Sequence, residues 1–137
     1  MSQEANYNDW MVKPFFFSKN ELKFFYELQK YIKWKRVLLF SKVRVADLVK
    51  NRKYIPTSEF YQVFWRTSQR HIDYVITDYK WRLLCAIELD WDSHKTDIKT
   101  IASDDFKKKF FKTIELPLIR FQNNKEHNLK RLDKVLS

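Results

Sequence analysis

Three acidic residues in two neighbouring apolar runs are the strongest chemical signal in this chain. Glu88 and Asp90 close the run 83–90, and side chains two apart on a strand share a face, roughly 7 Å apart along the backbone. Asp73 lies in the run 71–77, and a hairpin can place it beside Glu88, depending on register. Clustered carboxylates destabilise a fold unless a cation compensates them, and Mg²⁺ is the default cation for hard oxygen ligands. The pattern predicts a metal site for phosphodiester chemistry, against the alternative that the acids end a strand and face water separately.

Four runs rich in β-branched and apolar residues are predicted to form the strands that position these acids. The runs are 37–45, 71–77, 83–90 and 117–121. The second and third form an antiparallel hairpin around the turn 78–82. Because the third run is nearly all apolar, it is predicted to be a central strand that is covered on both faces.

The first predicted helix begins at Ser18 and ends near Lys33. Ser18 and Glu21 have the spacing of a capping box, in which each side chain accepts a hydrogen bond from the backbone N–H of the other. Apolar residues at near-helical spacing are expected to face the core. They are Leu22, Phe25, Leu28 and Ile32.

The remaining segments complete one domain. Helices are predicted over 103–115 and 124–136, with a loop over 91–103. The segment 50–68 fits either a short helix or a strand. The order α-β-β-β-α-β-α implies an α/β fold with a mixed central sheet flanked by helices. We expect a single domain over residues 18–137, preceded by an N-terminal arm over residues 1–17.

The composition limits the chemistry and favours an anionic partner. The chain has no Gly, which excludes the Walker loop, the GxGxxG motif and other sites that need glycine backbone geometry. A single Cys, Cys85, excludes an internal disulfide. A net charge of +10 favours DNA or RNA, although a compositional bias towards Lys, Phe, Asn and Tyr is an alternative source of that charge. Neither a membrane span nor a secretory signal is evident, so we expect no membrane partner and a cytoplasmic location.

Several ordered segments resemble a known family. They are FSKVRVADL at 40–48, HIDYVI at 71–76, AIELD at 86–90 with His94 after it, DDFK at 104–107 and LPLIRF at 116–121. Together they resemble a bacterial domain family of unknown function that is placed in the PD-(D/E)XK nuclease superfamily, near the very-short-patch repair endonucleases. The resemblance covers about residues 18–122.

The resemblance implies a restriction-endonuclease-like α-β-β-β-α-β core that uses Mg²⁺, with Mn²⁺ as an alternative, to hydrolyse nucleic-acid backbones. Asp73 matches the first acid of the motif and Glu88 the second. The lysine that usually follows the second acid by two residues is replaced here by Asp90. Lys107 is expected to supply the missing cation, with Lys108 close behind it.

Two more residues gain a role from the resemblance, and each keeps a structural alternative. His94 lies six residues after Glu88, a spacing similar to that of the catalytic His in the repair endonucleases, so it is a candidate general base or phosphate contact. It is otherwise an ordinary loop residue. Glu21 resembles the first-helix acid that joins the metal site in many members, while the capping box explains it equally well.

The sequence therefore predicts a Mg²⁺-dependent endonuclease that hydrolyses nucleic acid, with DNA favoured over RNA. The expected catalytic residues are Asp73, Glu88, Asp90, His94 and Lys107. The expected metal ligands are Glu21, Asp73, Glu88 and Asp90. The expected nucleic-acid contacts are Arg70, His71, Lys95 and Lys108.

Two other functions stay open at this stage. The loss of the usual lysine leaves a catalytically inactive nucleic-acid-binding module of the same fold as an alternative, and a protein-interaction domain is a third. The basic residues 107–109 and 112 are otherwise a solvated helix face, and Arg70 and His71 otherwise flank a strand. The oligomeric state is open, and a homodimer is compatible with the sequence.

Overall fold

The computed structural model describes residues 5–51, 54–90, 98–123 and 125–136. Within these residues the chain forms four α-helices, two short 3-10 helices and one four-stranded sheet. The α-helices are α1 (Lys19–Ile32), α2 (Thr57–Ser68), α3 (Ile98–Thr113) and α4 (Asp133–Leu136). The 3-10 helices are η1 (Val45–Leu48) and η2 (Leu129–Leu132). The strands are β1 (Val37–Arg44), β2 (His71–Asp78), β3 (Leu83–Asp90) and β4 (Leu118–Gln122).

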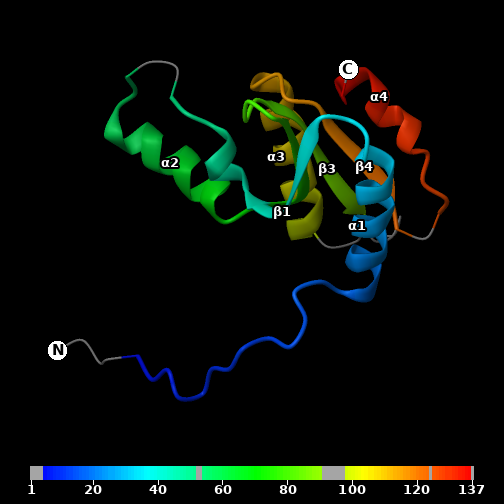
Figure 1. The fold of residues 1–137 in the computed structure, drawn as a ribbon. Coiled ribbons are helices and arrows are strands. Elements are labelled where there is room, and N and C mark those ends of the chain that lie inside the picture. The colour runs from blue at the N-terminus through cyan, green and yellow to red at the C-terminus, as the bar shows by residue number, and fades with distance from the viewer. Residues whose placement is uncertain (1–4, 52–53, 91–97, 124, 137) are drawn as a thin grey trace.

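The sheet is mixed and its strands follow the chain order β1-β2-β3-β4 (Figure 1). β1, β2 and β3 pair antiparallel, whereas β3 and β4 pair parallel. A parallel pair needs a crossover connection, and α3 lies within the connection from β3 to β4. The predicted α/β fold with a mixed sheet is confirmed at this level.

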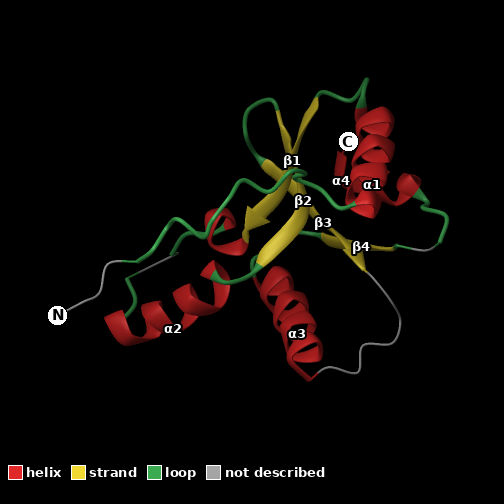
Figure 2. Ribbon diagram, turned by 90° about the horizontal axis from the view of Figure 1, so that it is seen from below, coloured by secondary structure: helices red, strands yellow, loops and turns green. Residues whose placement is uncertain are grey.

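Helices cover both faces of the sheet (Figure 2). On one face, Phe24 and Leu28 of α1 pack with Ile87 of β3 and Leu132 of η2. On the other face, Phe111 of α3 packs in a second buried cluster with residues of β2 and β3. β3 contributes to both clusters, because its alternate side chains point to opposite faces. The prediction that this strand is central and covered on both sides is therefore confirmed.

The capping box at the start of α1 is confirmed. Ser18 Oγ accepts a hydrogen bond from the Glu21 N–H at 3.3 Å, and Glu21 Oε1 accepts one from the Ser18 N–H at 2.9 Å. The predicted buried stripe is confirmed for Leu28 and Ile32, which are buried. It is wrong for Leu22, which is exposed, and it omits the buried Phe24. The observed inner face is Phe24, Leu28 and Ile32, residues four apart that line one side of a helix.

The helices after β1 differ from the sequence-based predictions or complete them. The segment 57–68 is a helix, which settles the open choice between helix and strand. α3 begins at Ile98, so residues 98–102 are helical and not loop; the polar residues before Phe106 lie inside the helix. The C-terminal segment is not one α-helix, because Asn128 caps the short 3-10 helix η2 through a bond from the Lys130 N–H, and α4 follows it.

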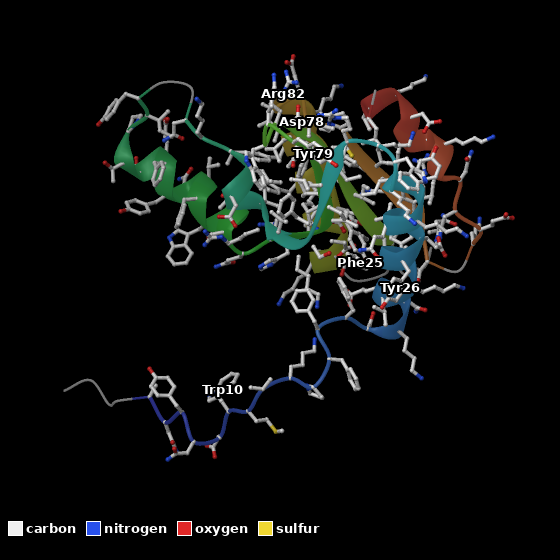
Figure 3. The ribbon with its side chains drawn as sticks, in the orientation of Figure 1. Trp10, Phe25, Tyr26, Asp78, Tyr79 and Arg82 are labelled. Carbon is white, nitrogen blue, oxygen red and sulfur yellow. The ribbon has the colours of Figure 1, made fainter. Side chains whose placement is uncertain are left out.

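A chain without glycine still needs left-handed backbone positions. Lys42, Trp81 and Glu115 have φ values of 55°, 67° and 59°. Trp81 lies in the turn between β2 and β3, and Glu115 follows the last turn of α3. Each such residue costs roughly 1 kcal/mol relative to glycine. Residues 5–15 run away from the helices and sheet, and Trp10 lies there in solvent (Figure 3). Phe17 instead packs against the core beside Phe25 and Tyr74.

Candidate functional site

The antiparallel hairpin brings two of the predicted acids together. Tyr74 pairs with Ile87, and the same register carried one residue further sets Asp73 opposite Glu88. Asp73 Oδ2 accepts a hydrogen bond from the Leu89 N–H at 2.8 Å, which fixes the carboxylate against the end of β3. Glu88 is itself buried. The sequence left the hairpin register open, and the observed register places Asp73 beside Glu88.

Lys107 of α3 forms an ion pair with one of these acids. Its Nζ donates to Glu88 Oε1 at 2.7 Å and to the His71 carbonyl at 3.0 Å. The pair is largely buried, with 13% of the lysine side chain and 10% of the glutamate side chain exposed. Lys107 is therefore not part of a solvated helix face, whereas its neighbour Lys108 is exposed. We refer to Asp73, Glu88 and Lys107 as the acid–lysine cluster.

A second ion pair network borders this cluster, and the sequence analysis gave its central residue no role. Arg120 of β4 pairs in register with Glu88, and its Nη1 lies 3.1 Å from Asp90 Oδ1 and 3.4 Å from Asp104 Oδ1. Asp90 is thus held by a cation from the neighbouring strand. One sequence signal was available, because a charged residue between Ile119 and Phe121 is unusual inside an apolar strand.

Burial makes both acids of the cluster hard to ionise. Burial raises the pKa of Asp73, although the Leu89 N–H and the charge of Lys107 oppose the effect, and the charge of Glu21 adds to it. Burial also raises the pKa of Glu88 from an ordinary value of 4.5 to about 7, against the charge of Lys107 and with the help of the charge on Asp73. The cluster therefore favours a further cation whenever both carboxyls are ionised.

This pKa shift predicts that the metal-free protein loses stability as the pH rises. Between the unfolded value of 4.5 and the folded value of about 7, the native state holds a proton on Glu88 that the unfolded chain has released. The unfolding free energy should fall across this window by about 3 kcal/mol at most. Glu88→Gln removes the titration, so its stability relative to the parent should improve by that amount between pH 4 and pH 8. Chemical denaturation over this range measures the difference, and a constant difference would contradict the assignment.

Glu21 lies close enough to act on the cluster while it also caps α1. Its Oε1 is engaged in the capping box, and its charge raises the pKa of Asp73. The Tyr74 hydroxyl on the same strand as Asp73 donates to the Glu21 carbonyl. The two explanations of Glu21 that the sequence left open are thus not exclusive.

The other predicted site residues fall into three groups. Arg70 packs its guanidinium 4.5 Å from the centre of the Phe106 ring and donates from Nη1 to the Arg66 carbonyl. His71 and Lys108 are exposed near the cluster. His94 and Lys95 lie outside the described residues.

The carboxylates of Asp73 and Glu88 are the candidate ligands for a divalent cation. Over residues 5–51, 54–90, 98–123 and 125–136, no three His, Cys, Asp or Glu side chains are arranged to hold a metal ion. Asp73, which is half-buried, and Glu88, which is buried, nevertheless supply two adjacent hard oxygen donors, which is the chemistry that Mg²⁺ prefers. The residues fit such an ion through these two carboxylates, with Lys107 at present bound to one Glu88 oxygen.

Fold and site together define a mixed α/β domain with a buried acid–lysine cluster at the end of its central strand. The family model for a protein of unknown function (DUF2726) matches residues 13–136, and the chain belongs to this family. Comparisons with curated proteins and with solved structures found no match. Among the described helices, none is long and apolar enough to cross a membrane.

Proposed function

We propose that this protein is a metal-dependent nuclease with a restriction-endonuclease-like core that hydrolyses phosphodiester bonds, with DNA favoured over RNA. The observation that carries the proposal is the buried juxtaposition of Asp73, Glu88 and Lys107. The strand order supports it, since three antiparallel strands followed by a helix and a parallel strand match the core that the sequence resemblance implies.

The acids and the lysine of the cluster have different proposed roles. Asp73 and Glu88 would hold Mg²⁺ or Mn²⁺, which when bound neutralises charge at the phosphodiester and activates water as the nucleophile. Lys107 presents a fixed ammonium beside Glu88, where it can stabilise negative charge that develops on the phosphate. Arg120 neutralises Asp90, which stands where a lysine is usual, and so keeps a third carboxylate from repelling the substrate.

The charge of the whole chain supports a polyanionic substrate. The net charge is +10, while Glu88 pairs with Lys107 and Asp90 pairs with Arg120. Basic residues outside the cluster would contact the backbone phosphates and release counterions, so binding should weaken steeply with salt.

A catalytically inactive nucleic-acid-binding module is the second candidate. Two observations favour it: Asp90 replaces the usual lysine, and Lys107 occupies a Glu88 oxygen that a metal would otherwise use. This candidate predicts salt-sensitive binding without metal-dependent products.

A cleavage time course separates these candidates. Purified protein is incubated with single- and double-stranded DNA and RNA in Mg²⁺, Mn²⁺ or EDTA. The nuclease gives products in either metal and none in EDTA. Binding without products selects the inactive module. If the protein shows neither binding nor products at physiological salt, both candidates are rejected and a protein-interaction domain is left.

Glu21→Gln tests whether the first-helix acid contributes to this activity. Glutamine at the same position preserves the capping box, so the unfolding free energy should change by less than about 0.5 kcal/mol. The charge that acts on Asp73 is lost, and cleavage in Mg²⁺ should fall about tenfold, as for other outer contacts of a metal site. Parental cleavage by a stable Gln variant would limit Glu21 to its cap.

A further inference from the structure

α2 stands apart from the two helix layers that cover the sheet (Figures 1 and 2). It lies between β1 and β2 in the chain, in a position that the α-β-β-β-α-β core does not require. It packs mainly against η1. Among its twelve residues Thr67 alone is fully buried. Since helix stability in proteins comes mostly from burying an apolar face, such an exposed helix calls for another explanation.

The exposed face of α2 is aromatic. Tyr61 and Trp65 are 52% and 59% exposed, and residues four apart lie on the same side of a helix. Phe60 and Phe64 stack beside them, with ring centres 5.7 Å apart. Large aromatic side chains grouped in solvent mark an interaction surface. We refer to Tyr61 and Trp65 as the aromatic face.

The described sequence around this face suits a polyanion. Lys50, Arg66 and Arg70 lie in α2 or close to it along the chain, and Glu59 is the one acid among the described residues 50–51 and 54–70. Aromatic rings interleaved with cations fit bases and phosphates together, because the rings stack on base planes and the cations neutralise the backbone. An apolar protein partner would not account for this charge.

The C-terminal end of α2 is linked to the acid–lysine cluster through the residues that follow it. Arg70 connects the end of α2 to α3, since it donates to the Arg66 carbonyl and packs on Phe106. His71 follows Arg70 and Lys107 follows Phe106 along the chain. These two residues are also in contact, because Lys107 Nζ donates to the His71 carbonyl. A strand bound along α2 would therefore be directed towards Asp73 and Glu88.

We propose that the aromatic face of α2 stacks on unpaired bases, so that single-stranded nucleic acid is the substrate class presented to the cluster. The assignment of the cluster as the end point rests on the proposed nuclease function, whereas the binding does not. Unpaired bases offer exposed π faces to protein side chains, whereas bases inside a duplex are already stacked on each other.

The test measures binding without cleavage. Fluorescence anisotropy in EDTA gives Kd for a labelled oligo-dT and for a duplex of equal length. The aromatic face is removed as Tyr61→Ala/Trp65→Ala. The matched control is Trp34→Ala/Tyr79→Ala, which removes one exposed Trp and one exposed Tyr, 88% and 55% exposed. Tyr79 follows the far end of β2 (Figure 3), and Trp34 precedes β1, whose first residue pairs with that end. Thermal melting verifies that each variant folds.

We expect the Tyr61/Trp65 variant to bind oligo-dT at least tenfold more weakly, with duplex binding changed by less than threefold. The control should bind both as the parent does, and Trp65→Phe, which keeps a ring, should retain most of the affinity. An unchanged Kd for oligo-dT, or equal losses for both substrates, would overturn the proposal.

The outcome is separable from that of the nuclease proposal. If the parent protein gives no metal-dependent products but shows these binding differences, the aromatic face stands and the cleavage function fails. If cleavage in Mg²⁺ occurs and the Tyr61/Trp65 variant binds and cuts oligo-dT like the parent, the aromatic face fails alone.

Discussion

Asp73→Asn is expected to lower Mg²⁺-dependent cleavage by about a thousandfold or more while the protein stays folded. The substitution removes the negative charge and keeps the size of the side chain. An amide oxygen can still accept the hydrogen bond that the Leu89 N–H donates at 2.8 Å, so the end of β3 keeps its partner. The loss would therefore come from the missing charge at the cluster. Initial rates of product formation, measured with the same oligonucleotide in Mg²⁺, give the ratio.

Asp105→Asn is the matched control for this change. Asp105 lies on α3 near the cluster, but its side chain is 68% exposed and pairs loosely with Lys109 at 3.9 Å. The same loss of one charge there should change the rate by less than about threefold, because exposed ion pairs are worth little. Titration calorimetry adds a second readout, in which the parent binds Mg²⁺ or Mn²⁺ in the presence of an uncleavable oligonucleotide and Asp73→Asn does not. Equal cleavage by the parent and Asp73→Asn would remove Asp73 from the site.

The features that the sequence predicted correctly depend on neighbours along the chain. The capping box of Ser18 and Glu21 is a signal within four consecutive residues, and the hairpin of β2 and β3 needs one short turn. The register was left open by the sequence, and the structure shows a shift between Ile76 and Thr77 before the strands set Asp73 against Glu88. The two acids in adjacent strands were therefore predictable, whereas their alignment was not.

The features that it missed depend on segments far apart in the chain. Arg120 meets Asp90 because β4 returns parallel to β3 after a helical crossover, and no local pattern gives that register. The core residue Phe24 was missed because three consecutive apolar residues, Phe24, Phe25 and the exposed Tyr26, give no unique helical phase. Lys107 was singled out through the family resemblance, while the lysine run around it reads as a solvated surface.

The second large expected effect is a loss of stability when Lys107 is replaced. Lys107→Met should lower the unfolding free energy by about 2 kcal/mol at pH 8, because it leaves Glu88 buried without its cation and removes the bond to the His71 carbonyl. The loss is smaller than the 3–5 kcal/mol usual for broken buried pairs, since Glu88 can take up a proton. Chemical denaturation at pH 8 and pH 5 measures it.

The pH dependence distinguishes the charge from the packing. Burial raises the pKa of Glu88 to about 7, and Lys107 opposes that rise, so its removal raises the pKa further. At pH 5 Glu88 is protonated in the parent and the variant alike, and Lys107→Met should cost less than about 1 kcal/mol there. Adding Glu88→Gln should restore most of the stability at pH 8, because no buried charge is then left unpaired.

Lys108→Met provides the control from the next residue of α3. Lys108 is exposed, so the same substitution should change stability by less than about 0.5 kcal/mol at either pH. In the cleavage assay Lys107→Met should lose about a hundredfold, as expected for one charge that stabilises a transition state, while Lys108→Met should lose far less. Equal destabilisation by Lys107→Met at pH 5 and pH 8 would mean that the lysine acts through packing alone, and the cluster would then lack the cation that replaces the usual lysine after Glu88.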